Sequence, residues 1–312
     1  MESLKIIKMK TKTIAKVLKN KLNEWLDSIE DETLRIDVKK NLLVSGGSIA
    51  SMLLREDVND YDIYIQDMDV LVRLAEYYAK DKVLDGRRRL EYLKNDFPDI
   101  DHDNPIGRDG FKFVAEQYIR LSNLKSDQVK LNINGAGERI EQEKDTHYLP
   151  VFFSQNAISL SDDIQIVLRF NGTPEEIHKT FDFIHATNYF TFDEGLVLNK
   201  EALESLLTRN LSYQGSLYPV TSMIRVKKFV SRKWTINAGE LLKMMFQISE
   251  LDLTDIETLE EQLIGVDVAY FSTLVNALRN VEKKKITSSY INTLIDKIFN
   301  NYDGDEDEKI VT

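Results

Sequence analysis

The stretch that decides the fold reads LLVSGGS at residues 42–48 and, twelve residues after its last serine, DYDIYI at residues 60–65. The first part is a short apolar run that ends in two glycines, and residues 49–54 behind it favour a helix. Glycines at a strand-to-helix turn let the backbone come close to a ligand, and the first N–H groups of a helix favour anions. The pattern predicts an anion-binding turn at Gly46, Gly47 and Ser48.

The second part places two carboxylates on one face of an expected strand. Side chains alternate along a strand, so Asp60 and Asp62 share a face with Tyr64, whereas Ile63 and Ile65 line the other face. Carboxylates about 7 Å apart along a strand repel each other unless a cation lies between them. Mg²⁺ is commonly held by one or two carboxylates together with substrate phosphates. Either half of the pattern alone favours a plain turn or two surface aspartates, but the order and spacing together favour a metal–nucleotide site.

This combination resembles the signature of the DNA polymerase beta-like nucleotidyltransferase superfamily. The resemblance implies that Gly46, Gly47 and Ser48 bind the triphosphate of a nucleoside triphosphate. It also implies that Asp60 and Asp62 hold two Mg²⁺ ions, for which Mn²⁺ is an alternative, and that a third carboxylate follows on a later strand. The implied reaction moves a nucleoside monophosphate to an acceptor hydroxyl and releases pyrophosphate, without identifying the acceptor.

The third carboxylate has two candidates in the chain. Residues 181–185 read FDFIH, which predicts a strand with an aspartate between aromatic residues. An acid in an apolar strand is costly unless it is paired or binds a metal, so Asp182 is the preferred third metal ligand and catalytic carboxylate. Asp163 is the alternative, but it begins its strand beside another aspartate and is better explained as a solvated strand end.

A second resemblance lies downstream, in residues 218–236. This segment is similar to the one that follows the catalytic domain in CCA-adding enzymes and bacterial poly(A) polymerases, although Tyr218 stands where those enzymes have an acid before the proline. Its basic residues predict contacts to the triphosphate or base, and a solvated helix face is the alternative. More broadly, residues 156–274 resemble nucleotidyltransferases encoded by bacteriophages. The predicted nucleotide contacts of the segment are Arg225, Lys228 and Arg232.

The composition of the chain limits which kinds of site and partner are possible. The 312 residues include no cysteine, which excludes disulfides and thiolate metal sites, and a cytoplasmic setting, that of the host for a phage protein, is expected. No apolar stretch approaches the roughly 20 residues that span a bilayer, so no membrane partner is expected. The net charge of −11 counts against a large nucleic-acid footprint but leaves room for a local basic groove.

The expected fold class is α+β, with a mixed-sheet nucleotidyltransferase core and an α-helical domain behind it. Helical periodicity in the last third of the chain predicts six helices between residues 201 and 299. The expected divisions are N-terminal helices at 1–40, a catalytic core at 41–195 with an insertion at about 66–146, a helical domain at 196–300 and an acidic disordered tail at 301–312.

Three functions remain open at this point. The first is nucleotide transfer to an RNA 3′ end such as that of tRNA, which the downstream resemblance and the lysine-rich N-terminus favour. The second is nucleotidylation of a protein or small molecule, which the acidic body favours. The third is nucleotide binding without catalysis. The base preference, the number of nucleotides added and the oligomeric state do not follow from the sequence.

Overall fold

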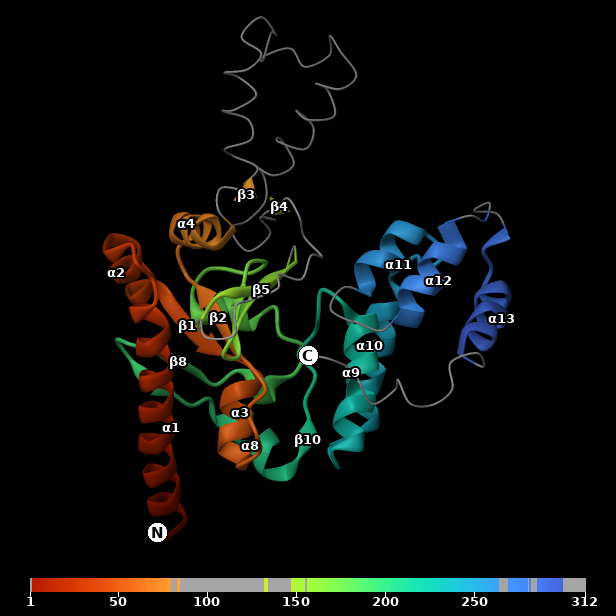
Figure 1. Cartoon of the computed structure of the whole chain (residues 1–312). Coiled ribbons are helices and arrows are strands. Elements are labelled where there is room, and N and C mark those ends of the chain that lie inside the picture. The colour runs from red at the N-terminus through yellow and green to blue at the C-terminus, as the bar shows by residue number, and fades with distance from the viewer. Residues whose placement is uncertain are drawn as a thin grey trace, which may run out of the picture. The chain divides into compact units, whose positions relative to one another are not determined.

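The computed structural model describes residues 2–79, 83–84, 132–133, 147–154, 156–263, 269–279, 281 and 285–299 (Figure 1). The chain forms two compact units. The first comprises Met1–His178 and Ala186–Asn199, and the second comprises Lys179–His185 and Lys200–Thr312. Most of the insertion predicted at 66–146 and all of the tail at 301–312 lie outside the described residues.

A seven-stranded sheet organises the first unit. Strands β2 and β7 pair in parallel and the other neighbours are antiparallel, which confirms the predicted mixed sheet. Two adjacent strands, β1 and β2, carry the glycine turn and the DYD segment. The order across the sheet is β5 (Pro150–Phe153), β6 (Ala157–Leu160), β7 (Ile164–Val167), β2 (Tyr61–Ile65), β1 (Leu42–Ser45), β8 (Tyr189–Thr191) and β9 (Gly195–Val197).

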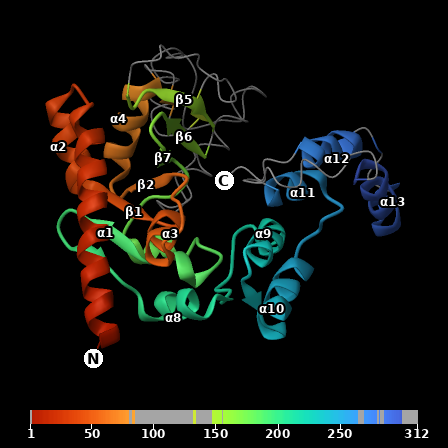
Figure 2. The same ribbon diagram turned by 60° about the horizontal axis from the view of Figure 1, so that its bottom comes forward.

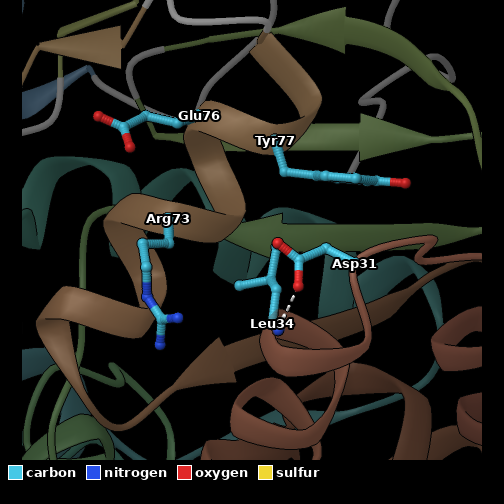
Figure 3. Close-up of a pocket in the computed structure, with 5 residues that line it drawn as sticks. All are labelled: Asp31, Leu34, Arg73, Glu76 and Tyr77. Carbon is cyan, nitrogen blue, oxygen red and sulfur yellow. Dashed lines mark hydrogen bonds between the residues drawn. The ribbon is translucent and has the colours of Figure 1, made fainter.

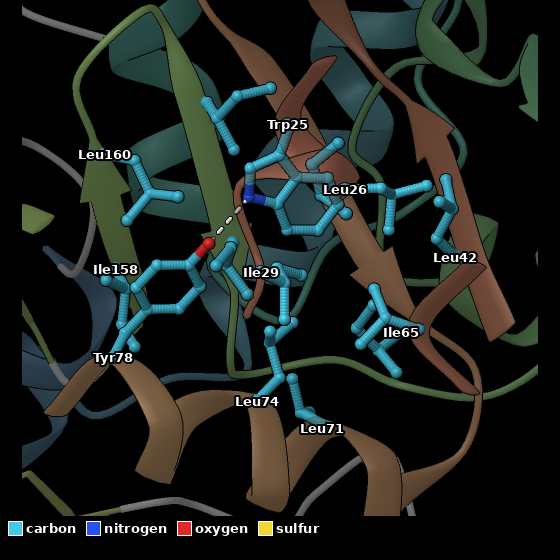
Figure 4. Packing of buried hydrophobic residues seen from close by; sticks show 14 of the residues in the cluster. Trp25, Leu26, Ile29, Leu42, Ile65, Leu71, Leu74, Tyr78, Ile158 and Leu160 are labelled. Carbon is cyan, nitrogen blue, oxygen red and sulfur yellow. Dashed lines mark hydrogen bonds between the residues drawn. The ribbon is translucent and has the colours of Figure 1, made fainter. Parts of the chain in front are cut away.

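Helices pack on this sheet to form the larger core of the molecule. Figure 4 shows Trp25 of α1 (Glu2–Asp27) and Tyr78 of α4 (Met68–Ala79) meeting over strand residues, and the Trp25 indole N–H donates to the Tyr78 hydroxyl at 2.9 Å. Both side chains are buried, so the bond satisfies their only polar atoms. Within the described residues, the unit also contains the helices α2 (Glu32–Asn41), α3 (Gly47–Leu54) and α7 (Pro174–His178).

Helix α4 corrects the predicted limits of the insertion. The predicted insertion at about 66–146 includes this helix, yet Leu71, Leu74 and Ala75 are completely buried in the core of the first unit. Behind α4, the short strands β3 (Val83–Leu84) and β4 (Asn132–Ile133) form an antiparallel pair, with Leu84 opposite Asn132. The amphipathic pattern of α4 therefore belongs to the core of the first unit and not to an insertion.

The second unit is helical, as predicted. Its distal helices share a small apolar core that includes Leu259, Leu274 and Leu278. Asn237 and Asp255 begin two of the helices by accepting a backbone N–H of the first turn. Figure 2 shows the elements from a second direction. They are α8 (Lys200–Thr208), β10 (Asn210–Leu211), α9 (Pro219–Ser231), β11 (Thr235–Ile236), α10 (Ala238–Ser249), α11 (Ile256–Gln262), α12 (Ala269–Arg279) and α13 (Ser288–Phe299). Among the described helices, none combines the length and apolar character of a bilayer-crossing segment.

A surface cavity of about 240 Å³ lies at the junction of α2 and α4 (Figure 3). Its polar groups already serve the fold. The Asp31 carboxylate accepts the Leu34 N–H at 2.9 Å, and the Tyr77 hydroxyl accepts the Glu30 N–H at 3.2 Å. Arg73 donates to Asp37 at 2.6 Å. No residue predicted to bind a nucleotide lines this cavity, which is a feature of helix packing.

Candidate functional site

The glycine turn lies between β1 and α3, as the sequence predicts. Helix α3 begins at Gly47, and Gly46 before it has φ 103° and ψ −149°, a conformation that favours glycine. The N-cap residue is Gly46, which has no side chain to cap the helix, and the first backbone N–H groups of α3 follow directly after it. The Ser48 hydroxyl is 2% exposed and has no hydrogen-bond partner within the described residues. The turn thus offers several donors to an anion.

The turn is in contact with one of the two predicted carboxylates. A Cβ built on Gly46 would lie 2.9 Å from Asp62 Oδ2. Any other residue at this position would therefore be strained by the positive φ and would also collide with the carboxylate. The Asp62 side chain therefore lies directly against the backbone of the turn. The structure brings together the two halves of the motif, which are separated by sixteen positions in the sequence.

The alternation predicted for the second half of the motif is present in β2. Ile63 and Ile65 belong to the main core cluster, and Asp62 points to the opposite face, toward Gly46. Tyr64 is 7% exposed on that opposite face. Asp60 immediately precedes the strand instead of lying within it, and pairing in β2 begins one residue later, where the Tyr61 N–H donates to the Asp163 carbonyl at 2.7 Å.

The end of β1 is braced by a segment that follows far along the chain. The Gly46 N–H donates to the Ala186 carbonyl at 3.0 Å. The Ser45 hydroxyl lies 3.2 Å from that same carbonyl and 3.0 Å from the carbonyl of Asn188. These contacts were not predicted, because nothing in the sequence near Ser45 indicates that its partners are two backbone carbonyls some 140 residues away.

Asp182 lies in the second unit and not on a strand of the sheet. The predicted strand at 181–185 is wrong: Phe183 forms an isolated bridge with Tyr213, and Ile184–Ala186 is a short 3₁₀ helix. The Asp182 carbonyl accepts a hydrogen bond from the Gln214 N–H at 3.0 Å, so the backbone at Asp182 is bonded within the second unit and not to a strand of the sheet. Alternating aromatic residues indicated a half-buried strand, whereas Phe183 is buried in an aromatic cluster of the second unit.

Two predicted site residues of the second unit pair with each other. Arg225 Nη1 donates to Asp182 Oδ2 at 2.9 Å, and the Asp182 side chain is 14% exposed. Arg225 lies in α9, which begins with Pro219 as the sequence predicts. Lys228 lies in the last turn of that helix, and Arg232 follows at its C-cap with an exposed side chain. The basic segment is therefore a helix, and Arg225, the first of its predicted anion contacts, is already paired with the carboxylate of Asp182.

His185 is the buried centre of the aromatic cluster. Its ring centroid lies 4.8 Å from those of Phe229 and Trp234. Burial lowers the pKa of His185 to about 4, and the carboxylate of Asp182 opposes that shift. Its 5% exposure is that of a side chain packed inside the cluster.

The donor set at the turn fits a hard divalent cation in part. Asp62 supplies carboxylate oxygens at the turn, Asp60 immediately precedes the same strand, and the N-terminus of α3 suits phosphate. Within the residues that the structure describes, no three histidine or acidic side chains gather closely enough to hold a metal ion. Asp60 and Asp62 belong to the first unit and Asp182 to the second.

Comparison with solved structures returns CCA-adding enzymes. The Thermotoga maritima CCA-adding enzyme complexed with tRNA is 13% identical, with a TM-score of 0.37 over 92% of this chain and 67% of the enzyme. The Bacillus stearothermophilus CCA-adding enzyme in complex with CTP is 12% identical, with a TM-score of 0.34 over 80% of this chain and 52% of that enzyme.

Sequence comparison returns a phage protein. A protein of Bacillus phage SPbetaL7 named Gabija anti-defense 2 is 27% identical over 103 residues, which are 32% of this chain and 26% of the phage protein. The match thus spans about a quarter of that relative. The sequence model of the family described as Gabija anti-defense 2 family protein matches residues 16–209, more than half of the chain. The predicted resemblance to phage proteins is confirmed, and the chain belongs to the Gabija anti-defense 2 family.

Proposed function

We propose that this protein is a metal-dependent nucleotidyltransferase that acts against the Gabija defence of a bacterial host. One observation carries the catalytic part of the proposal, namely the contact between the glycine turn and Asp62. A backbone open to phosphate and a carboxylate suited to metal lie side by side, with 2.9 Å between Asp62 Oδ2 and the position of a Gly46 Cβ. The role against Gabija comes from the family to which the chain belongs.

Each residue has a stated role in this proposal. The first N–H groups of α3 and the Ser48 hydroxyl bind the β- and γ-phosphates, with Gly46 and Gly47 giving access to the backbone. Asp60 and Asp62 hold Mg²⁺, which when bound stabilises the charge that develops on the phosphate oxygens. Asp182 is proposed as the third carboxylate, and Arg225, Lys228 and Arg232 as contacts to the triphosphate or the base.

The acceptor hydroxyl has two candidate sources. The basic helix α9 and the lysine-rich N-terminal helix favour an RNA 3′ end such as that of tRNA. The net charge of −11 favours a protein or small molecule, for example a component of the Gabija system, over a long nucleic acid. The RNA end is the first choice because cationic side chains follow the nucleotide site in the sequence.

Nucleotide binding without catalysis is a second candidate function, which one observation favours. The ion pair between Arg225 and Asp182, at 2.9 Å, occupies the carboxylate that would complete a catalytic set. A protein of this kind would bind a nucleotide at the glycine turn without transferring it.

The test is transfer of label from each α-³²P-labelled nucleoside triphosphate with Mg²⁺ to total RNA or to protein extract from cells that carry Gabija. Label on RNA supports the first acceptor and label on protein the second. The proposal expects that Asp60→Ala and Asp62→Ala abolish transfer while the protein stays folded, because neither carboxylate belongs to the apolar core. Asp57→Ala, an exposed aspartate just before this segment, is the matched control and should transfer normally.

A phage challenge separates catalysis from binding. If Asp62→Asn still protects phage from Gabija at the wild-type level and transfers no label, the protein acts by binding alone. If Asp62→Asn loses protection while it still binds nucleotide in calorimetry, transfer is required.

A further inference from the structure

The residue before the glycine turn, Ser45, is completely buried and has three polar neighbours. Two are the backbone carbonyls of Ala186, at 3.2 Å, and Asn188, at 3.0 Å. The third is the Nε2 atom of His178, at 2.8 Å, which approaches from the end of α7. His178 thus reaches the end of β1 from a helix that lies more than a hundred residues later in the chain.

The chemistry of these neighbours determines which group donates each hydrogen bond. A hydroxyl has one hydrogen, and a backbone carbonyl only accepts. The Ser45 hydrogen therefore points to the two carbonyls, and its oxygen accepts from His178. Otherwise the Nε2 lone pair and two carbonyl oxygens would compete, at about 3 Å, for the single hydrogen of a hydroxyl that is itself completely buried, which is unfavourable. His178 is accordingly in the tautomer that carries its hydrogen on Nε2.

The same carbonyl groups hold the turn. Ala186 accepts the Gly46 N–H at 3.0 Å in addition to facing the Ser45 hydroxyl. Asn188 is fixed in turn, because its side-chain oxygen accepts the Asn199 N–H at 2.9 Å. Residues 45 and 46 therefore lie against one backbone segment: the Gly46 N–H already satisfies the Ala186 carbonyl, and the Ser45 hydroxyl lies within hydrogen-bond distance of both carbonyls.

We infer that His178 is a positioning residue for the phosphate-binding turn, acting through Ser45 and not through the substrate. Its Nε2–H orients the Ser45 hydroxyl toward Ala186 and Asn188, which sets the backbone from which Gly46, Gly47 and Ser48 present their N–H groups. This inference rests on the proposed function, because it takes the turn to be the site of the triphosphate. A histidine that only filled space would not need a hydrogen on Nε2.

Surroundings of the ring agree with this role. The His178 ring lies 5.7 Å from that of Tyr189, the residue that pairs with Ser45 across β1 and β8. Burial lowers the pKa of His178 to about 4, with an opposing contribution from Glu175. The ring is therefore neutral at physiological pH and remains a single donor to Ser45.

The experiment compares His178→Phe, which keeps a ring without a donor, with His178→Gln, whose amide can donate to Ser45. We expect His178→Phe to raise the KM for the nucleoside triphosphate about tenfold, the effect of one lost hydrogen bond, with kcat changed less than KM. His178→Gln should restore most of the affinity. His147→Phe, an exposed histidine in the same unit, is the matched control and should leave KM unchanged.

A spectroscopic readout keeps this test independent of activity. Imidazole ¹⁵N chemical shifts of the wild-type protein should show His178 neutral at pH 7 with its hydrogen on Nε2. A hydrogen on Nδ1, or a folded His178→Phe variant with wild-type KM, overturns the inference. If the wild-type protein transfers no nucleotide, the proposed function fails, and the tautomer together with the Kd of an unhydrolysable nucleotide for each variant still decides the role of His178.

Discussion

The α-carbon of Gly46 lies against the carboxylate of Asp62, so closely that a methyl group on it would come within 2.9 Å of Oδ2. A glycine is required there twice, by its φ of +103° and by the space that the carboxylate occupies. The contact joins the turn after β1 to the second residue of β2. It makes the glycine and the aspartate parts of one site, with consequences that can be measured.

Gly46→Ala tests this contact. We expect it to destabilise the protein by about 1–3 kcal/mol, from backbone strain and the close approach, and to reduce nucleotide binding strongly. Gly195→Ala, in the same unit at φ +72° with nothing within 4 Å of its added Cβ, carries strain alone and should cost less. Combining Gly46→Ala with Asp62→Ala removes the nearest atom and should recover part of the stability. Equal losses in urea unfolding for the two single alanine variants would contradict the contact.

Ser48→Ala separates function from stability. The hydroxyl is buried without a hydrogen-bond partner in the described part of the chain, so its removal should leave the free energy of unfolding unchanged or raise it by about 1 kcal/mol. Nucleotide affinity, measured by calorimetry, should fall several-fold because a phosphate donor is lost. Ser51→Ala, one turn later in α3, should bind like the wild type. An affinity unchanged in Ser48→Ala would remove this residue from the site.

The ion pair of Asp182 with Arg225 allows a test of catalysis against structure. The pair is partly exposed, so breaking it with Arg225→Ala should cost only on the order of 1 kcal/mol in thermal unfolding. Asp182→Asn should cost a similar amount. If Asp182 is the third carboxylate, however, Asp182→Asn lowers the transfer rate at least about a hundredfold. A variant that transfers nucleotide at the wild-type rate would leave Asp182 with the ion pair alone.

Acid should destabilise the second unit through His185. Its pKa of about 4 in the folded protein lies below its ordinary value of 6.5, so between these values the unfolded chain binds a proton that the folded chain does not. Stability is therefore full above pH 6.5 and falls as the pH approaches 4, by on the order of 3 kcal/mol.

His185→Phe keeps an aromatic ring among Phe229 and Trp234 and removes the titration. Urea unfolding between pH 4 and 7 should then depend less on pH than in the wild type. His147→Gln, which changes an exposed histidine, should keep the wild-type dependence. A slope unaffected by His185→Phe would contradict the buried neutral ring.

Local pattern was sufficient for most of the fold. The apolar run before Gly46, the alternation in residues 61–65 and the helical periodicity from residue 200 onward each correspond to an element of the structure. Residues 68–79 fall within the predicted insertion although they form a core helix, because periodicity shows which face of a helix is apolar and not what covers that face. The strand predicted around Asp182 failed because Phe183 and His185 are buried against residues 213–234, which local alternation cannot indicate.

The candidate site was predictable only where its chemistry is local. Gly46, Gly47 and Ser48 are adjacent, and the strand alternation of Asp62 could be read directly. The contacts of Ser45 with His178 and Ala186 could not be predicted, because nothing in the sequence distinguishes a serine and a histidine 133 positions apart from any other such pair. Likewise, the pairing of Asp182 with Arg225 joins two residues that the sequence assigned to separate roles.

The pairing of β3 with β4 places Leu84 opposite Asn132. The two ends of the intervening segment therefore meet at one short ladder, outside the seven-stranded sheet. Because the entropic cost of joining two points of a chain rises only slowly with the number of residues between them, residues added between Leu84 and Asn132 should disturb the register of β1 and β2 little.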